Sequence, residues 1–142
     1  MAAGQSVAYV SEAGTPLLAD PGFQLSRAVR AEGLSVWAVP GPSALLAALA
    51  VAGLPTDRFH FAGFLPSAKT ARRAGLRELR DGGGTLLLYD STHRDRDTVS
   101  DICEVMEPER RVVLCRELTT KFEEVLSGTA ATLHARLAEQ PV

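Results

Sequence analysis

The feature that most constrains the fold is a pair of short apolar runs, each ended by a loop rich in glycine and proline. The first run covers residues 7–10 and ends in the loop 11–16; the second covers residues 34–39 and ends in the loop 40–43. Runs of this length are typical of buried strands, and a helical apolar pattern follows each loop. The alternation of strand, loop and helix predicts a parallel sheet with crossover helices, and hence an α/β fold.

The two helices have recognisable ends in the sequence. Asp20 and Pro21 predict an N-cap and a first helical position, and Gly33 predicts the end of that helix. Ser43 predicts the cap of a second helix, which runs to about Ala52.

The second half of the chain has a different layout, and we expect a domain boundary near Gly63. This gives a domain at residues 1–62 and another at 63–142. The expected strands are 58–62, 85–89, 111–115 and 122–126. The expected helices are 69–80, one with its apolar face at 99–106 that stops at Pro108, and 129–139.

Composition excludes several classes of protein. The 15 basic and 17 acidic residues give a net charge of −2, which excludes a strongly basic nucleic-acid coat but not a local basic face. No apolar run reaches the roughly 18 residues of a transmembrane helix. The two cysteines have no metal-site spacing, so we expect no metal site, and we expect reduced thiols in a cytoplasmic protein.

Ligands of open α/β sheets bind at the carboxyl ends of the strands, where both glycine- and proline-rich loops are expected to lie. The two loops together favour one small-molecule site, although a plain turn and a capped helix explain each loop alone. Neither a GxGxxG nor a GxxxxGK[ST] motif is present.

Other polar groups leave two interpretations open. His93, beside Ser91, belongs either to a site or to a capping loop, and residues 116–121 form either a site or a solvated turn. A basic stripe on the helix 69–80 is either an exposed face or a phosphate contact. The stripe consists of Lys69, Arg73, Arg77 and Arg80.

Seven motifs, taken in order, resemble those of a known family. They are SEAGTP (11–16), DPG (20–22), PGPSA (40–44), GLPTDRF (53–59), GFLP (63–66), YDSTHR (89–94) and RELT (116–119). The series resembles the bacterial 16S rRNA (cytidine-2′-O)-methyltransferases of the tetrapyrrole methylase superfamily. The chain departs from that pattern at Glu12, Asp90 and Thr120, and it lacks the family's opening loop and closing strand. We therefore interpret it as an internal fragment or a truncated gene product.

The resemblance implies two α/β domains with S-adenosylmethionine bound in the cleft between them. It also implies a cytoplasmic homodimer, with no membrane partner, that acts on 16S rRNA in the small ribosomal subunit. The residues it implies for cofactor binding are Ser11, Ala13, Gly14, Thr15, Pro16, Gly41, Ser43, Ala44, Phe64, Leu65, Tyr89 and Ser91.

The implied reaction is an in-line attack of a ribose 2′-oxygen on the sulfonium methyl group. The hydroxyl is a weak acid, so a base or a nearby cation would assist; the candidates are Glu117, Lys121 and His93. Arg94 and Arg116 join the basic stripe as expected RNA contacts. Two alternatives stay open: a superfamily enzyme for a tetrapyrrole or protein substrate, and a catalytically incomplete binding or assembly fragment.

Overall fold

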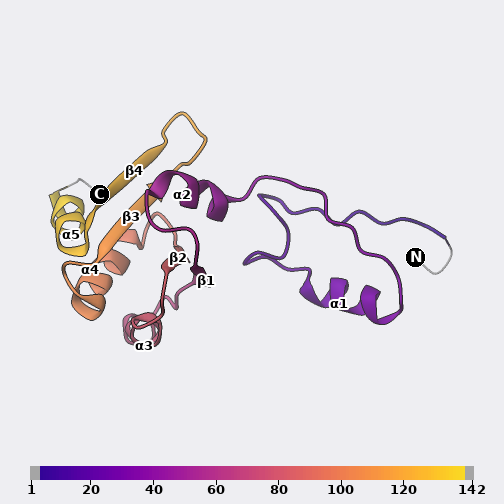
Figure 1. The fold of residues 1–142 in the computed structure, drawn as a ribbon, viewed down its shortest axis with the longest axis horizontal. Helices are drawn as coiled ribbons and strands as arrows, with labels where there is room; N and C mark the ends of the chain where they lie inside the picture. The colour runs from indigo at the N-terminus through magenta and orange to yellow at the C-terminus, as the bar shows by residue number, and fades with distance from the viewer. Residues whose placement is uncertain (1–3, 140–142) are drawn as a thin grey trace. The chain divides into compact units, whose positions relative to one another are not determined.

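The computed structural model describes residues 4–139, and the chain divides into two compact units, residues 1–44 (unit 1) and 45–142 (unit 2). Figure 1 shows unit 1 in indigo and purple, with helix α1 (Phe23–Ala31), and the remaining elements in the later colours. The division falls after Ala44, earlier in the chain than the expected border near Gly63. The domain division at residues 62 and 63 stays a prediction.

Unit 1 differs from the prediction of two strands. Residues 7–10 and 34–39 have no strand pairing in the described part of the unit, so the strands predicted there are wrong for this structure. A strand needs a partner for its backbone hydrogen bonds, and these segments have none within residues 4–44. Their apolar side chains are exposed instead: Val10 to 80 %, Trp37 to 82 % and Val39 to 87 %.

Helix α1 begins later than predicted. Its N-cap is Gly22, whose carbonyl accepts a hydrogen bond from the Ser26 N–H at 3.0 Å, so the prediction of Asp20 as the cap is wrong. Gly22 has a φ of +125°, and a Cβ there would lie 2.8 Å from the ring of Tyr9. The chain therefore enters the helix at Gly22, because glycine tolerates the positive φ and has no Cβ to clash with the tyrosine ring.

Unit 2 contains the helices and strands predicted for the second half, with small shifts at their ends. Strand β4 begins two residues later than expected. The elements are β1 (Phe59–Phe64), α3 (Lys69–Leu79), β2 (Thr85–Tyr89), α4 (Asp95–Met106), β3 (Arg111–Arg116), β4 (Glu124–Thr129) and α5 (Ala130–Glu139), preceded by α2 (Ala44–Ala52), which starts directly after Ser43 as predicted.

The four strands form two separate pairs. β1 and β2 are parallel, with Phe59 opposite Thr85, and α3 is the crossover between them. β3 and β4 form an antiparallel hairpin, with Arg111 opposite Thr129. A parallel pair with a helical crossover, joined to a hairpin and further helices, confirms the predicted α/β class. The cleft between two domains stays a prediction.

Helix α4 contributes to both hydrophobic clusters of unit 2. Ile102 and Met106 pack with Leu76 of α3 and with the partly buried leucines of β2. Val99 packs with side chains of β4 and α5. This two-sided burial explains the apolar face that the sequence predicted for residues 99–106.

A buried ion pair joins α3 to α4. Arg72 Nε donates to Asp101 Oδ2 at 2.7 Å, and these two residues are only 3 % and 1 % exposed. Arg73 Nε donates to the other oxygen, Asp101 Oδ1, at 2.6 Å, and Arg73 also pairs with Glu104. Burial disfavours the carboxylate of Asp101, but the hydrogen bonds from Arg73 and Arg72 outweigh it and hold its pKa below the ordinary value of 3.8.

We predict that Asp101→Asn lowers the free energy of unfolding by about 3 kcal/mol, because it leaves two guanidinium groups without their shared carboxylate. Because the folded pKa of Asp101 is lowered, its contribution is present above pH 3.8 and is lost as the pH falls through the lower folded pKa. Denaturant unfolding at pH 7 and pH 3 should therefore show a smaller difference between variant and wild type at pH 3.

The matched control is Asp97→Asn on the same helix. Asp97 lies 4.0 Å from Arg72, and its side chain is 74 % exposed. An exposed pair of this kind contributes under about 1 kcal/mol. Equal losses of stability in the two variants would contradict the importance we assign to Asp101.

Candidate functional site

The two glycine- and proline-rich loops of unit 1 meet. They do not follow strand ends as the sequence predicted, because residues 7–10 and 34–39 form no strands in the described part of the unit. Thr15 Oγ1 donates a hydrogen bond to the carbonyl of Pro42 at 2.9 Å, across 27 residues of chain. A Cβ on Gly14 would lie 3.6 Å from the same carbonyl oxygen. The backbone of the loop 40–43 therefore lies close to the small residue Gly14 of the loop 11–16.

The first loop has local order of its own. Ser11 Oγ donates a hydrogen bond to the carbonyl of Ala13 at 3.0 Å and accepts one from the Ala13 N–H at 3.3 Å. Gly14 has a φ of +73°, in the left-handed region that glycine adopts without strain. The loop thus presents backbone groups rather than large side chains, which suits close approach by a ligand.

Tyr89 connects the end of β2 to the start of α2 within unit 2. Its hydroxyl oxygen accepts a hydrogen bond from the Leu45 N–H at 3.2 Å. The tyrosine ring meets Phe61 edge-on, with centroids 4.8 Å apart, and Phe64 at 5.6 Å. Phe64 and Tyr89, both predicted to bind cofactor, therefore lie in contact.

Arg94 ties together the segments that follow the parallel strands β1 and β2. Its guanidinium donates to Ser91 Oγ at 3.1 Å and to the carbonyl of Leu65 at 3.5 Å, and it pairs with Asp90 at 3.0 Å. The carboxyl ends of parallel strands are the usual place for ligands in α/β proteins. Leu65 from one predicted motif and Ser91 and Arg94 from another lie together at this edge.

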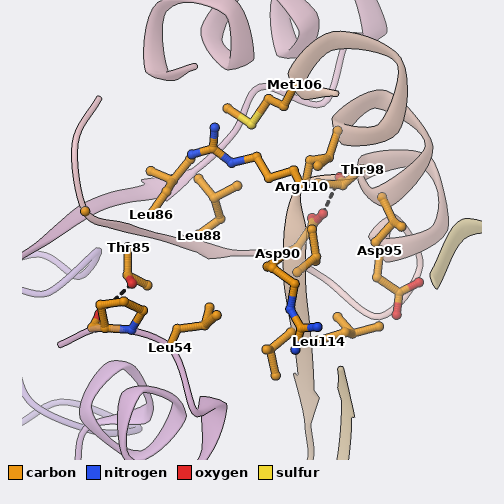
Figure 2. Close-up of a pocket in the computed structure, with 17 residues that line it drawn as sticks. Leu54, Thr85, Leu86, Leu88, Asp90, Asp95, Thr98, Met106, Arg110 and Leu114 are labelled. Atoms are coloured by element: carbon orange, nitrogen blue, oxygen red, sulfur yellow. Dashed lines mark hydrogen bonds between the residues drawn. The ribbon is translucent and has the colours of Figure 1, made fainter. Parts of the chain in front are cut away.

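Asp90 organises the turn before α4. Its Oδ1 accepts from the Ser91 N–H at 2.8 Å, and its other oxygen accepts from the hydroxyl of Thr98; Figure 2 shows this second contact as a dashed line. The sequence identified Asp90 as a departure from the family pattern within a segment expected to line the cofactor cleft, and it did not predict these hydrogen bonds. The signal for this role is an aspartate just before a helix whose first turns contain a threonine, Thr98.

Arg116 joins the hairpin to the start of α4. It bonds to Asp95 Oδ2 through Nη2 at 2.7 Å and to Glu124 Oε2 through Nη1 at 2.9 Å. Burial opposes the charge of Arg116, but the hydrogen bonds to Asp95 and Glu124 outweigh it and raise the pKa of the guanidinium. A phosphate at Arg116 would therefore compete with two carboxylates already in place.

The three candidate catalytic residues lie on two loops of unit 2. Glu117 accepts a hydrogen bond from Thr120 Oγ1 at 3.2 Å and has a positive φ of 51°. Lys121 lies with its Nζ 5.7 Å from the centroid of the Phe122 ring. His93 is exposed in the turn before α4. The ion pair between Arg116 and Asp95 joins the start of one loop to the end of the other. The catalytic roles of all three residues stay predictions.

The predicted basic stripe is partly neutralised by acidic residues. Arg73 pairs with Asp101 and Glu104, and Arg80 pairs with Glu107 at 3.2 Å. In the described part of the chain, Lys69 and Arg77 have no carboxylate within ion-pair distance. The acidic residues 97, 101 and 104 recur on α4 at helical spacing, and that pattern is the signal that could have revealed the pairing with α3.

A cavity of about 490 Å³ lies in unit 2 between β2, α4 and β3. Leucines and other apolar side chains make most of its wall, and Asp90 and Asp95 stand toward one end (Figure 2). Arg110 extends toward Leu86 at another part of the wall. The cavity's lining is therefore apolar with charges at its borders.

Two kinds of feature are absent from residues 4–139. No His, Cys, Asp or Glu residues gather there in a group of three or more that could hold a metal ion. No helix in this range has the length and apolar character needed to cross a membrane.

These features, two meeting loops and an α/β unit with polar strand ends, agree with the comparison to known proteins. The model of the family described as Tetrapyrrole (Corrin/Porphyrin) Methylases matches residues 1–134. The chain therefore belongs to the tetrapyrrole methylase family, and the resemblance identified from the seven motifs is confirmed.

Several curated relatives have the name Ribosomal RNA small subunit methyltransferase I. The protein of Xylella fastidiosa (strain Temecula1) is 52 % identical over 135 residues, which cover 95 % of this chain and 50 % of the relative. The Pseudomonas aeruginosa protein is 47 % identical, with 92 % and 46 % covered. That of Halalkalibacterium halodurans is 44 % identical, with 89 % and 43 % covered. The chain thus spans about half the length of the relatives it matches.

We predict that Asp90→Ala lowers the free energy of unfolding by about 2 kcal/mol, because three hydrogen-bond donors lose their acceptor and Thr98 is buried. The control Ser91→Ala removes only the contact from Arg94 Nε and should cost about 0.5 kcal/mol. Thermal unfolding measures both. Equal costs would show that Asp90 does not organise this turn.

Proposed function

We propose that the protein containing this chain transfers a methyl group from S-adenosylmethionine to a ribose 2′-hydroxyl of a cytidine in 16S rRNA. The hydrogen bond from Thr15 to the Pro42 carbonyl carries the proposal, because it unites the two loops that the family resemblance assigns to the cofactor. Membership of the family and the names of the relatives give further support.

The loops of unit 1 fit such a cofactor in their chemistry. A sulfonium ion is a cation, and carbonyl oxygens of exposed loops are suitable neighbours for it. Gly14 and Gly41 leave open space around their backbones, apart from the Pro42 carbonyl near Gly14. Ser11, Ala13, Pro16, Ser43 and Ala44 are small or compact, so they leave room for the cofactor beside these glycines.

The bound cofactor would supply an activated methyl group, and the chain's own residues would supply position and proton handling. Holding two reactants in line lowers a barrier by several kcal/mol, which makes positioning the main expected contribution. Glu117, Lys121 and His93 are our candidates for accepting the hydroxyl proton or for favouring the alkoxide. His93 is exposed, and Lys121 is held beside an aromatic ring.

The RNA would be recognised mainly through its phosphates and its shape. Lys69 and Arg77 are the stripe residues best placed for phosphates, because Arg73 and Arg80 pair with carboxylates. Arg94 and Arg116 would first have to exchange their own carboxylate partners. We further propose that the protein works in the cytoplasm as a homodimer on the small ribosomal subunit.

The cofactor proposal predicts that Gly14→Ala weakens binding of S-adenosylmethionine by about tenfold. A side chain at a φ of +73° costs roughly 1–2 kcal/mol, and its Cβ would face the Pro42 carbonyl. Calorimetric titration of the 142-residue chain measures the affinity. Gly33→Ala is the control, because Gly33 has a φ of +70° with nothing near its Cβ and lies outside both loops.

Equal loss of affinity in the two variants would assign the effect to backbone strain in general. Wild-type chain that is folded and does not bind S-adenosylmethionine would favour the alternative of an incomplete binding or assembly fragment.

The substrate proposal predicts transfer of labelled methyl groups to small ribosomal subunits, and none to a free tetrapyrrole. The assay supplies radioactive S-adenosylmethionine with each acceptor and counts label in the purified acceptor. Label in the tetrapyrrole alone would replace the RNA proposal with the alternative from the same superfamily. A Lys69→Glu, Arg77→Glu double variant should lose RNA affinity while its affinity for the cofactor stays unchanged.

A further inference from the structure

Two residues of the segment 42–45, Pro42 and Leu45, are held by side chains from distant parts of the chain. Thr15 Oγ1 donates to the carbonyl of Pro42, 27 residues away. The Leu45 N–H donates to the hydroxyl oxygen of Tyr89, 44 residues away. The first contact lies in unit 1 and the second in unit 2. The end of one proposed cofactor loop is thus attached at both sides of Ser43 and Ala44.

The Tyr89 hydroxyl has a fixed position because its ring is fixed. The ring packs on Phe61 and Phe64 of β1, and Tyr89 itself ends β2 in register with Phe64. The first N–H groups of a helix have no partner within the helix and need another acceptor. Tyr89 supplies that acceptor to the first turn of α2, and Leu45 beside it is buried.

We propose that Thr15 and Tyr89 are positioning residues, which act on ligand binding through the backbone of residues 42–45. Each hydroxyl already holds a main-chain group of this segment, so its influence on a ligand passes through the segment. This inference rests on the proposed cofactor role of the loop, and it gives Thr15 and Tyr89 a role that needs no direct contact with the cofactor.

The experiment is a double-mutant cycle with Thr15→Val and Tyr89→Phe in the 142-residue chain. Calorimetry measures the dissociation constant for S-adenosylmethionine, and hydrogen exchange measures the protection of the Leu45 amide. We expect each single variant to bind about fivefold more weakly. The double variant should lose less than the product of the two effects, because both act on one short segment. Tyr89→Phe should also speed exchange at Leu45.

Two controls separate positioning from general stability. Thr15→Ser keeps the hydroxyl and should restore affinity to within about twofold of wild type. Asp101→Asn destabilises unit 2 without touching residues 42–45 and should leave the dissociation constant unchanged. A change of affinity in Asp101→Asn, or no recovery in Thr15→Ser, overturns the positioning role.

The remaining outcomes distinguish the inference from the function on which it rests. A folded wild-type chain without affinity for S-adenosylmethionine removes the cofactor role of these loops in this chain and favours the incomplete binding or assembly fragment. Wild-type binding that survives both single substitutions, or single effects that multiply in the double variant, overturns the inference alone. Unchanged exchange at the Leu45 amide in Tyr89→Phe overturns the assigned contact.

Discussion

The carboxylate of Asp101, buried between two arginines of α3, is the interaction on which the arrangement of unit 2 depends. A buried charge without partners is far more costly than a paired one, so α3 and α4 have one favourable register. Helix α3 is the crossover of the parallel pair, and α4 contributes to both hydrophobic clusters. Fixing these two helices against each other therefore fixes the parallel strands relative to the hairpin, although no backbone ladder joins the two pairs among the described residues.

The first turns of α4 extend this organisation to the strand ends. Asp95 holds Arg116 at the end of β3, and Thr98 donates to Asp90 after β2. The polar edge is thus assembled from paired charges rather than from exposed cations. An RNA phosphate gains little from an arginine that must first give up a carboxylate. Under the proposed function, this edge would select substrates by geometry, because a phosphate gains only where it replaces a carboxylate partner of an arginine.

The sequence predicted most elements of unit 2 because their signals are local. Gly82 to Gly84 separate a helix from a strand, and the apolar spacing from Val99 to Met106 marks one helix face. The prediction of strands at 7–10 and 34–39 is wrong because a strand forms only against a partner strand, and a local sequence pattern does not show whether a partner exists. The prediction of Asp20 as the N-cap is wrong because the N-cap of the helix is Gly22. The ring of Tyr9, which is distant in sequence, leaves room only for glycine at that position. The arginines at 73 and 80 follow the spacing of an exposed face, yet their partners lie on α4 and at Glu107 directly after it.

The candidate site shows the same limit, because local sequence patterns locate its loops but not the contacts between them. Motif order located the loops 11–16 and 40–43, but the contact between Thr15 and Pro42 is a property of the folded chain. Ordering a loop costs about 1–2 kcal/mol per residue, and a ligand that must order its own loop loses that amount from its affinity. Hydrogen bonds formed before the ligand arrives reduce this cost. Small residues leave the backbone open but hold it weakly, so the loop 40–43 depends on the Thr15 hydroxyl of the neighbouring loop for part of its order.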